Sequence, residues 1–153
     1  MWAEIHLHYN KFLLAVIYRP PNSPVPFWDD LQASYDLACA ASNKIGLMGD
    51  FNADPRSSQG KKRISFSDSY NLTIHVLEPT RTTDTTSTCL DQIITNIANF
   101  VNSVKVIPPV ANNDHSTVLA NLLFRHIKNP CFHRFTYYFL KHTSTNSDTH
   151  LVR

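Results

Sequence analysis

The chain has 153 residues, of which 42% are hydrophobic and 17% are charged, and its formal net charge is +2 with eight neutral histidines. This length and composition suit one soluble globular domain with a core of its own. The small positive charge allows contact with a phosphate backbone but does not by itself indicate nucleic-acid binding. The longest apolar run, residues 12–18, is too short to cross a bilayer, so no membrane segment is expected.

The cysteines and the one dense basic run point to no special site. Cys39, Cys89 and Cys131 form no CxxC pair, so they indicate neither a zinc site nor a disulfide framework. Cys39 falls in an apolar helical pattern and is expected to be a small core residue. The basic run at residues 61–63 is expected to be a solvated loop.

The first third of the chain predicts a hairpin followed by a helix. Residues 2–8 and 11–18 are expected to form two strands joined by a turn at residues 9–10. The second strand is continuously apolar, which is typical of a strand buried on both faces. Four prolines between residues 20 and 26 predict a loop. A helix is expected over residues 27–43, with Phe27, Leu31, Tyr35 and Ala38 on its buried face.

The rest of the chain predicts mostly strands. A short buried strand at residues 45–49 leads into Asp50, and a short helix is expected over residues 63–71. Further strands are expected at residues 73–77, 90–95, 103–107 and 116–124. This order predicts a mixed α/β fold with a largely antiparallel second half. Residues 1–126 are taken as the domain, and residues 127–153 as a polar tail or linker.

Three polar motifs fall at the ends of expected strands. They are Gly49, Asp50, Phe51 and Asn52; Leu90, Asp91, Gln92, Ile93 and Ile94; and Asn113, Asp114, His115 and Ser116. Each has a structural explanation when taken alone, because Gly-Asp pairs form turns and a single histidine is more often structural than catalytic. Strand ends that open into loops are nevertheless where α/β proteins usually place their sites.

Together, these motifs hold the side chains that phosphodiester cleavage requires. The reaction needs a hard cation, which Mg²⁺ provides through one or two carboxylates and several waters. It also needs a base for the attacking water and donors for the charge that develops on the phosphorane. A carboxylate beside an imidazole would fix the tautomer of that ring. The motifs supply each of these groups, provided that the fold brings them together.

In their order and rough spacing, these motifs resemble the endonuclease/exonuclease/phosphatase superfamily over residues 1–124. The sequence Tyr18, Arg19, Pro20, Pro21 and the sequence Pro79, Thr80, Arg81 are similar to its LINE-type retrotransposon branch. The resemblance implies an α/β fold in which a two-sheet β-sandwich is flanked by helices in four layers. It also implies Mg²⁺-dependent or Mn²⁺-dependent cleavage of DNA, with a reverse transcriptase domain downstream in a full-length element. A nuclear location is implied only by the DNA substrate.

The resemblance also implies roles for individual residues. Asp50 resembles the residue that activates the attacking water, and Asn52 its partner in holding the water and the phosphate. Asp91 resembles the carboxylate that orients a histidine, and His115 the donor to the scissile phosphate. The remaining roles are a phosphate contact for Tyr18, metal ligation for Asp50, Asn52 and Asp114, and a substrate contact for Thr80. Asp54 matches no family position and is read as a loop residue.

The sequence departs from the family pattern at its start. Family members place a strand with an Asn and a strand ending in a metal-binding Glu before the strand of Tyr18. Glu4 is the only acid among the 17 residues before Tyr18, and it does not match that Glu. About 80 to 100 residues of a complete domain are therefore expected to be absent, so the chain should cleave DNA poorly or not at all. Part of the run at residues 12–18 should then be exposed.

Two alternatives remain open at this point. The chain could be an inactive truncated remnant of the domain, in which the motifs persist without forming a working site. It could also be a phosphatase or phosphodiesterase of the same superfamily that acts on a small or lipid substrate. The Tyr-Arg-Pro-Pro and Pro-Thr-Arg cues favour the endonuclease over the second alternative.

Overall fold

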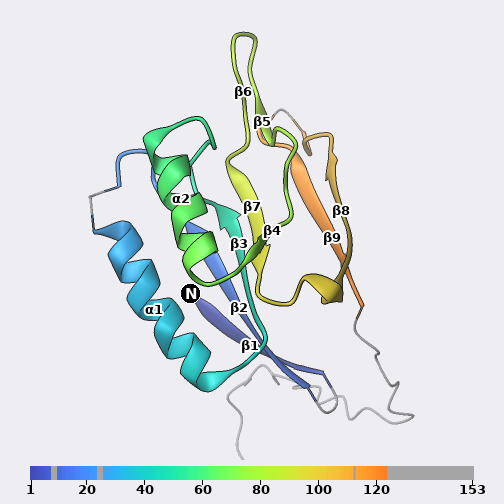
Figure 1. The fold of residues 1–153 in the computed structure, drawn as a ribbon. Helices are drawn as coiled ribbons and strands as arrows, with labels where there is room; N and C mark the ends of the chain where they lie inside the picture. Colours follow the sequence, from blue (N-terminus) through green and yellow to red (C-terminus); the bar gives the residue numbers. More distant parts are fainter. Residues whose placement is uncertain (8–9, 24–25, 112, 124–153) are drawn as a thin grey trace, which may run out of the picture.

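The fold, seen in a computed structural model, is described for residues 1–7, 10–23, 26–111 and 113–123. Its centre is a five-stranded sheet in the order β1-β2-β3-β7-β4 (Figure 1). These strands are β1 (Trp2–Leu7), β2 (Asn10–Tyr18), β3 (Ile45–Asp50), β4 (Thr73–Ile74) and β7 (Asp91–Thr95). β2 and β3 run parallel, and the other neighbours are antiparallel.

Two helices, α1 (Phe27–Ala41) and α2 (Ser58–Ser69), cover one face of this sheet (Figure 1). α1 buries Trp28, Leu31, Tyr35 and Ala38, and the expected Phe27 packs partly buried against the same core. Cys39 is exposed, which corrects its expected place in the core. The residue follows Ala38 on the helix and therefore turns away from the buried side. Where the sheet meets these helices, Ile45, Leu47 and Ile94 are fully buried and form the core.

α2 begins earlier than the sequence pattern indicated. The side chain of Ser57 accepts a hydrogen bond from the backbone N–H of Gly60, which caps the helix at a polar segment with little apolar periodicity. The basic run therefore lies in a helix and not in a loop. Lys61 and Lys62 are exposed, but helical spacing turns Arg63 inward, where it is buried near the backbone carbonyl of Cys89.

A hairpin of β8 (Val101–Ile107) and β9 (Thr117–Leu122) lies on the other face of the sheet (Figure 1). It follows a short 3-10 helix, Ala98–Phe100, and packs against Ile93 of β7. Helices, sheet and hairpin make three layers within the described part of the chain, where the resemblance implied four. The expected tail at residues 127–153 lies outside the described residues, as do residues 8 and 9 of the first hairpin.

The sheet face opposite the helices is partly open beside this hairpin. Val16 and Tyr18 of β2 are 48% and 68% exposed, and Met48 of β3 is 37% exposed. The continuous apolar run of β2 is therefore not buried on both faces, because β8 and β9 reach only the β7 side. The exposure expected for residues 12–18 is present.

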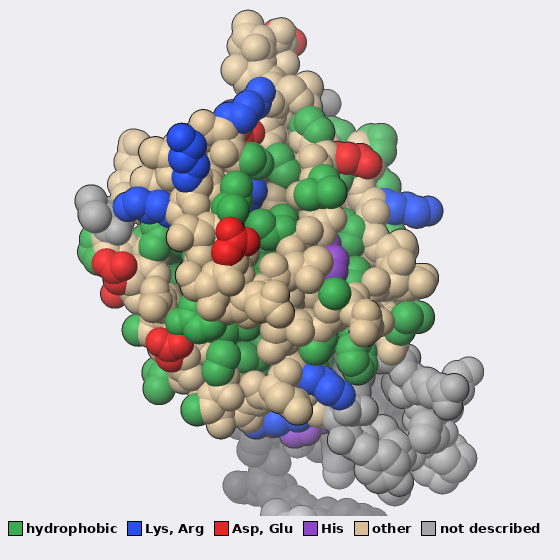
Figure 2. All heavy atoms as spheres, viewed as in Figure 1, with side chains coloured by type: hydrophobic (Ala, Val, Ile, Leu, Met, Phe, Trp, Pro, Cys, Tyr) green, Lys and Arg blue, Asp and Glu red, His purple; other side chains and the backbone are tan. Residues whose placement is uncertain are grey.

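A second hairpin, of β5 (Arg81–Thr82) and β6 (Ser87–Thr88), projects beyond the rest of the molecule (Figure 2). Its two short strands were not predicted, because the segment is rich in Thr and Ser and has no apolar alternation. The hairpin is joined to the body of the molecule through Thr80 at its base.

Candidate active site

Strand register brings three of the predicted side chains to one end of the sheet. Tyr18 ends β2 and pairs with Asp50, which ends β3, and Asp50 pairs with Asp91 at the start of β7. Directly paired residues project from the same face of a sheet. All three side chains therefore lie on the face opposite the helices, at the edge where β2 and β3 end.

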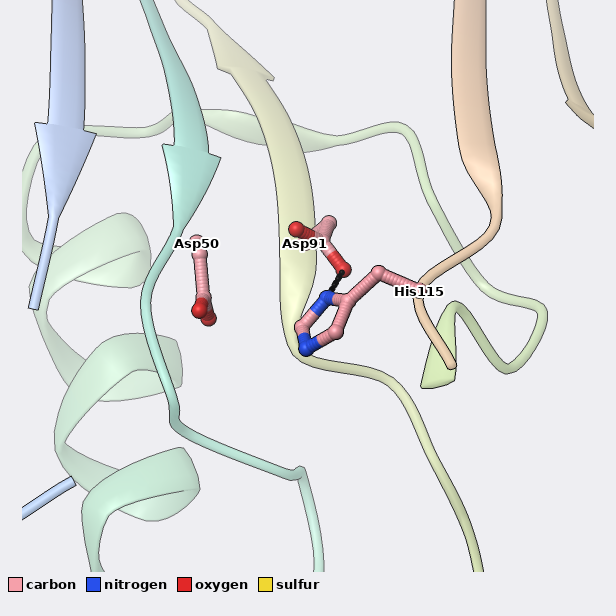
Figure 3. A group of neighbouring side chains, drawn as sticks. All are labelled: Asp50, Asp91 and His115. Atoms are coloured by element: carbon pink, nitrogen blue, oxygen red, sulfur yellow. Dashed lines mark hydrogen bonds and ion pairs between the residues drawn. The ribbon is translucent and has the colours of Figure 1, made fainter. Parts of the chain in front are cut away.

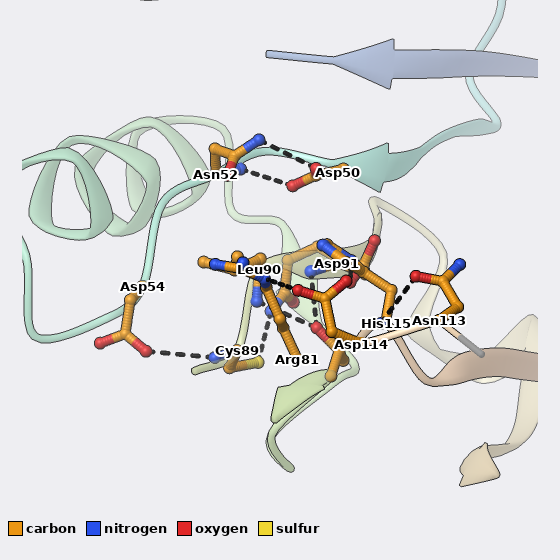
Figure 4. Close-up of polar contacts among 12 residues, drawn as sticks. Asp50, Asn52, Asp54, Arg81, Cys89, Leu90, Asp91, Asn113, Asp114 and His115 are labelled. Carbon is orange, nitrogen blue, oxygen red and sulfur yellow. Dashed lines mark hydrogen bonds and ion pairs between the residues drawn. The ribbon is translucent and has the colours of Figure 1, made fainter. Parts of the chain in front are cut away.

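A tight turn after β3 fixes the carboxylate of Asp50. The backbone N–H of Asn52 donates to Oδ1 of Asp50 at 2.8 Å, and the side-chain amide of Asn52 donates to Oδ2 at 2.9 Å (Figure 4). Asn52 has φ 43°, a left-handed conformation that asparagine tolerates better than most residues. The guanidinium of the buried Arg19 donates to the backbone carbonyl of Asn52, and the backbone carbonyl of Arg19 accepts from the side-chain amide of Asn52, so Arg19 supports the turn.

His115 reaches the same place from the loop before β9. Its Nδ1 lies 2.9 Å from Oδ2 of Asp91, so the expected contact between these two side chains is present (Figure 3). Because an ionised carboxylate only accepts hydrogen bonds, this contact places the proton on Nδ1. Asp50, Asp91 and His115 each offer a ligand atom within 4.8 Å of the others.

Burial raises the pKa of the Asp50 carboxyl, and the neighbouring charge of Asp91 adds to the increase. Hydrogen bonds from Asn52 and the nearby His115 act in the opposite direction. The net increase means that Asp50 holds its charge at a cost in the folded protein. Raised carboxyl pKa values are common where a site prepares a group for proton transfer or cation binding.

We expect Asp50→Asn to raise the melting temperature at pH 7 when no divalent cation is present. Because the folded pKa of Asp50 is raised, its stabilising contribution is present at pH values below the ordinary pKa and is lost as pH rises through the folded value. The gain in the variant should therefore be larger at pH 7 than near pH 4. Thermal denaturation followed by circular dichroism in EDTA measures it.

Asp54→Asn provides the control with the opposite sign. Hydrogen bonding to Arg56 lowers the pKa of Asp54 to about 2. Its stabilising contribution is therefore present above the ordinary pKa and is lost as pH falls towards 2. Asp54→Asn should lower the melting temperature at pH 7. Equal changes at pH 7 and pH 4 in both variants would contradict this account.

Asp114 lies beside this group but is paired elsewhere. Its Oδ2 accepts from Nε of Arg81 at 2.6 Å, and this hydrogen bond lowers the pKa of Asp114 (Figure 4). The group of mutually close ligand atoms contains Asp91 and His115 but not Asp114. The structure thus differs from the metal set expected from sequence, and metal ligation by Asp114 stays a prediction.

The substrate contact expected of Thr80 stays a prediction, and the surroundings of this residue do not favour it. Thr80 is 0% exposed, and its hydroxyl oxygen accepts hydrogen bonds from the backbone N–H groups of Leu90 and Asp91. A side chain without exposed surface would touch a substrate only if the segments around it moved apart. Asp54, in contrast, is the loop residue that was expected, because its carboxylate accepts from Arg56 and from the backbone of Cys89.

Sequence reasoning did not find three supporting residues: Arg19, Arg81 and Asn113. Asn113 accepts a hydrogen bond from the backbone N–H of His115, a local turn that asparagine forms readily. Arg19 and Arg81 both adjoin residues of the motifs, but nothing in their spacing indicates which group they contact. Their partners lie about 33 residues away along the chain.

The fold is that of the endonuclease/exonuclease/phosphatase proteins. One similar solved structure is the endonuclease domain of TRAS1, a telomere-specific non-LTR retrotransposon, with a TM-score of 0.68 and 13% sequence identity over 81% of this chain. Another is an endonuclease/exonuclease/phosphatase family protein from Leptotrichia buccalis, with a TM-score of 0.54 and 20% identity over 80% of this chain. The α/β fold class expected from the resemblance is thereby confirmed.

The chain spans 63% of the TRAS1 domain and 52% of the Leptotrichia protein. No protein-family model matches the chain, and no curated protein matches it in sequence. Among the residues that the structure describes, no helix is long and apolar enough to cross a membrane.

Proposed function

We propose that the chain carries the site of a Mg²⁺-dependent phosphodiester hydrolase, the DNA endonuclease of a non-LTR retrotransposon. The observation that carries this proposal is the meeting of Asp50, Asp91 and His115 at one end of the sheet, with His115 hydrogen-bonded to Asp91. The similarity to the TRAS1 endonuclease domain supports the choice of DNA as substrate.

The donor set fits a hard divalent cation. Asp50 offers a carboxylate in the group of close ligand atoms, and Mg²⁺ and Mn²⁺ bind proteins through one or two such groups with water completing the shell. We assign ligation to Asp50, with Asn52 and Asp114 as further oxygen donors. When bound, the cation supplies charge stabilisation for the non-bridging phosphate oxygens.

The remaining catalytic roles belong to side chains of this protein. Asp50, which Asn52 holds in one orientation, accepts the proton of the attacking water. Asp91 keeps the proton of His115 on Nδ1 and stabilises the protonated ring, which donates to the phosphate oxygens. The hydroxyl of Tyr18, which is exposed beside Asp50, contacts the phosphate.

A plasmid-nicking assay tests this proposal. Supercoiled plasmid is incubated with an excess of the 153-residue chain in Mg²⁺, in Mn²⁺ and in EDTA. We expect slow nicking that requires the cation and is lost in Asp50→Asn. The control is Asp36→Asn, at an exposed position of α1 that contacts Tyr70, and it should retain the nicking. Mn²⁺ binding, followed by electron paramagnetic resonance, should weaken in the same Asp50 variant.

The same protein is then offered a small phosphate monoester and a lipid phosphodiester. Faster turnover of either than of plasmid would favour a phosphatase or phosphodiesterase of this fold. Absence of both Mn²⁺ binding and nicking would favour an inactive relic. Translating the gene downstream of Arg153 tests the expected reverse transcriptase domain.

A further inference from the structure

Thr80 sits at the junction of three segments that form the site. Its hydroxyl oxygen accepts from the backbone N–H of Leu90 at 3.0 Å and from that of Asp91 at 2.9 Å. Its carbonyl accepts from the N–H of Ser116 at 2.7 Å, and its own N–H donates to the carbonyl of Thr88 at 2.9 Å. The N–H, the carbonyl and the hydroxyl oxygen of this fully buried residue are therefore all hydrogen-bonded.

These bonds connect the backbones that carry Asp91 and His115. Asp91 begins a strand of the five-stranded sheet, whereas His115 precedes a strand of the separate β8–β9 hairpin. Next to Thr80, Arg81 forms an antiparallel bridge with His115, and the N–H of Thr82 donates to the carbonyl of Asp114. The segment of Thr80 thus holds the His115 loop on one side, while the Thr80 hydroxyl holds the start of β7 on the other.

We propose that Thr80 is a positioning residue, whose hydroxyl sets the placement of Asp91 relative to His115. This inference rests on the proposed function, since it assigns a purpose to the Asp91–His115 pair. Thr80 acts through these two residues and touches no substrate. Within the described part of the chain, the Thr80 hydroxyl is the one side-chain acceptor for the backbone N–H groups of Leu90 and Asp91, where β7 begins.

The hairpin offers a matched control. The Thr88 hydroxyl oxygen is buried but has no hydrogen-bond partner among the described residues, although Thr88 belongs to the strand paired with β5. Replacing Thr88 by the isosteric valine therefore removes a hydroxyl that makes no hydrogen bond among the described residues. Replacing Thr80 by valine removes the oxygen that accepts from the buried N–H of Leu90 and the part-buried N–H of Asp91, and such groups are costly to leave unpaired.

The test compares Thr80→Val, Thr80→Ser and Thr88→Val in the full chain, without metal or DNA. Long-range ¹H–¹⁵N correlation spectra report the tautomer of the His115 ring. We expect the wild type, Thr80→Ser and Thr88→Val to show one tautomer with the proton on Nδ1. Thr80→Val should show a mixture, and nicking of plasmid should fall by about 10²-fold, as misplacement of a catalytic group typically causes.

An unchanged His115 spectrum in Thr80→Val would overturn the inference and leave the proposed function standing. If Thr80→Val does not fold, Thr80→Ala takes its place. Failure of both to fold, with Thr80→Ser and Thr88→Val folded, would show that Thr80 serves the fold only and would also overturn it. A mixed tautomer in Thr80→Val without metal-dependent nicking by the wild type would support the positioning and refute the proposed function.

Discussion

Replacing His115 with alanine is expected to reduce the metal-dependent nicking rate by about 10²–10⁴-fold, the range for loss of a positioned proton donor or charge stabiliser. The reason lies in the contact between Nδ1 and Asp91, which leaves Nε2 as the nitrogen available to the phosphate. Initial rates of plasmid relaxation at saturating Mg²⁺, with the protein in excess, measure the loss.

His75→Ala is the control for this substitution. The ring of His75 is also partly buried and bonded to one side chain, the hydroxyl of Thr95, but it lies near the opposite end of β7. Its loss should leave the nicking rate within a few fold of the wild type. Equal losses in the two variants would show that His115 matters only for stability.

Asp91→Asn separates two possible uses of Asp91 in the same assay. If Asp91 orients His115, the asparagine amide favours the wrong tautomer, so the nicking rate falls while Mn²⁺ affinity changes little. If Asp91 is itself a ligand, Mn²⁺ affinity falls as well. We expect the first result, because Oδ2 of Asp91 is already engaged by His115. A large loss of Mn²⁺ affinity would contradict this assignment.

Replacing Gly49 with alanine is expected to destabilise the protein by about 3 kcal/mol, the upper end of the range for strain at a special backbone conformation. Gly49 has φ +135°, and a Cβ there would lie 1.9 Å from the backbone carbonyl oxygen of Ile17. That oxygen belongs to the adjacent strand, so the clash is relieved only by separating β2 from β3. Tyr18 and Asp50 are the next pair along this register, so the site would be disturbed with the fold.

Gly46→Ala in the same strand is the matched control. A Cβ at Gly46 would meet Cζ of Phe12 at 2.7 Å, the far end of a side chain that can shift. We expect its cost to be clearly smaller in urea denaturation followed by circular dichroism. A Gly49 variant that is as stable as the Gly46 variant would contradict the close approach of the two backbones.

Local sequence patterns were sufficient to predict those features that depend only on residues close together in the chain. Apolar runs predicted β1, β2, β3 and β7, because burial of alternating or continuous apolar side chains determines where strands form. The Asp50–Asn52 turn is equally local, since both hydrogen bonds join residues two positions apart. Ordered motifs therefore indicated the fold class, and the solved structures similar to this chain confirm it.

Sequence patterns were insufficient to predict contacts between residues that lie far apart in the chain. The resemblance implied a substrate contact for Thr80 and a metal for Asp114, but the sequence did not indicate that the first is buried or that the second pairs with Arg81. It also gave no sign that Arg63 turns inward or that α2 starts at Ser58. Residue type and spacing determined which groups this protein brings to one sheet edge. Only the tertiary structure decided which of them touch, because hydrogen-bond partners depend on strand register and burial across segments more than 20 residues apart.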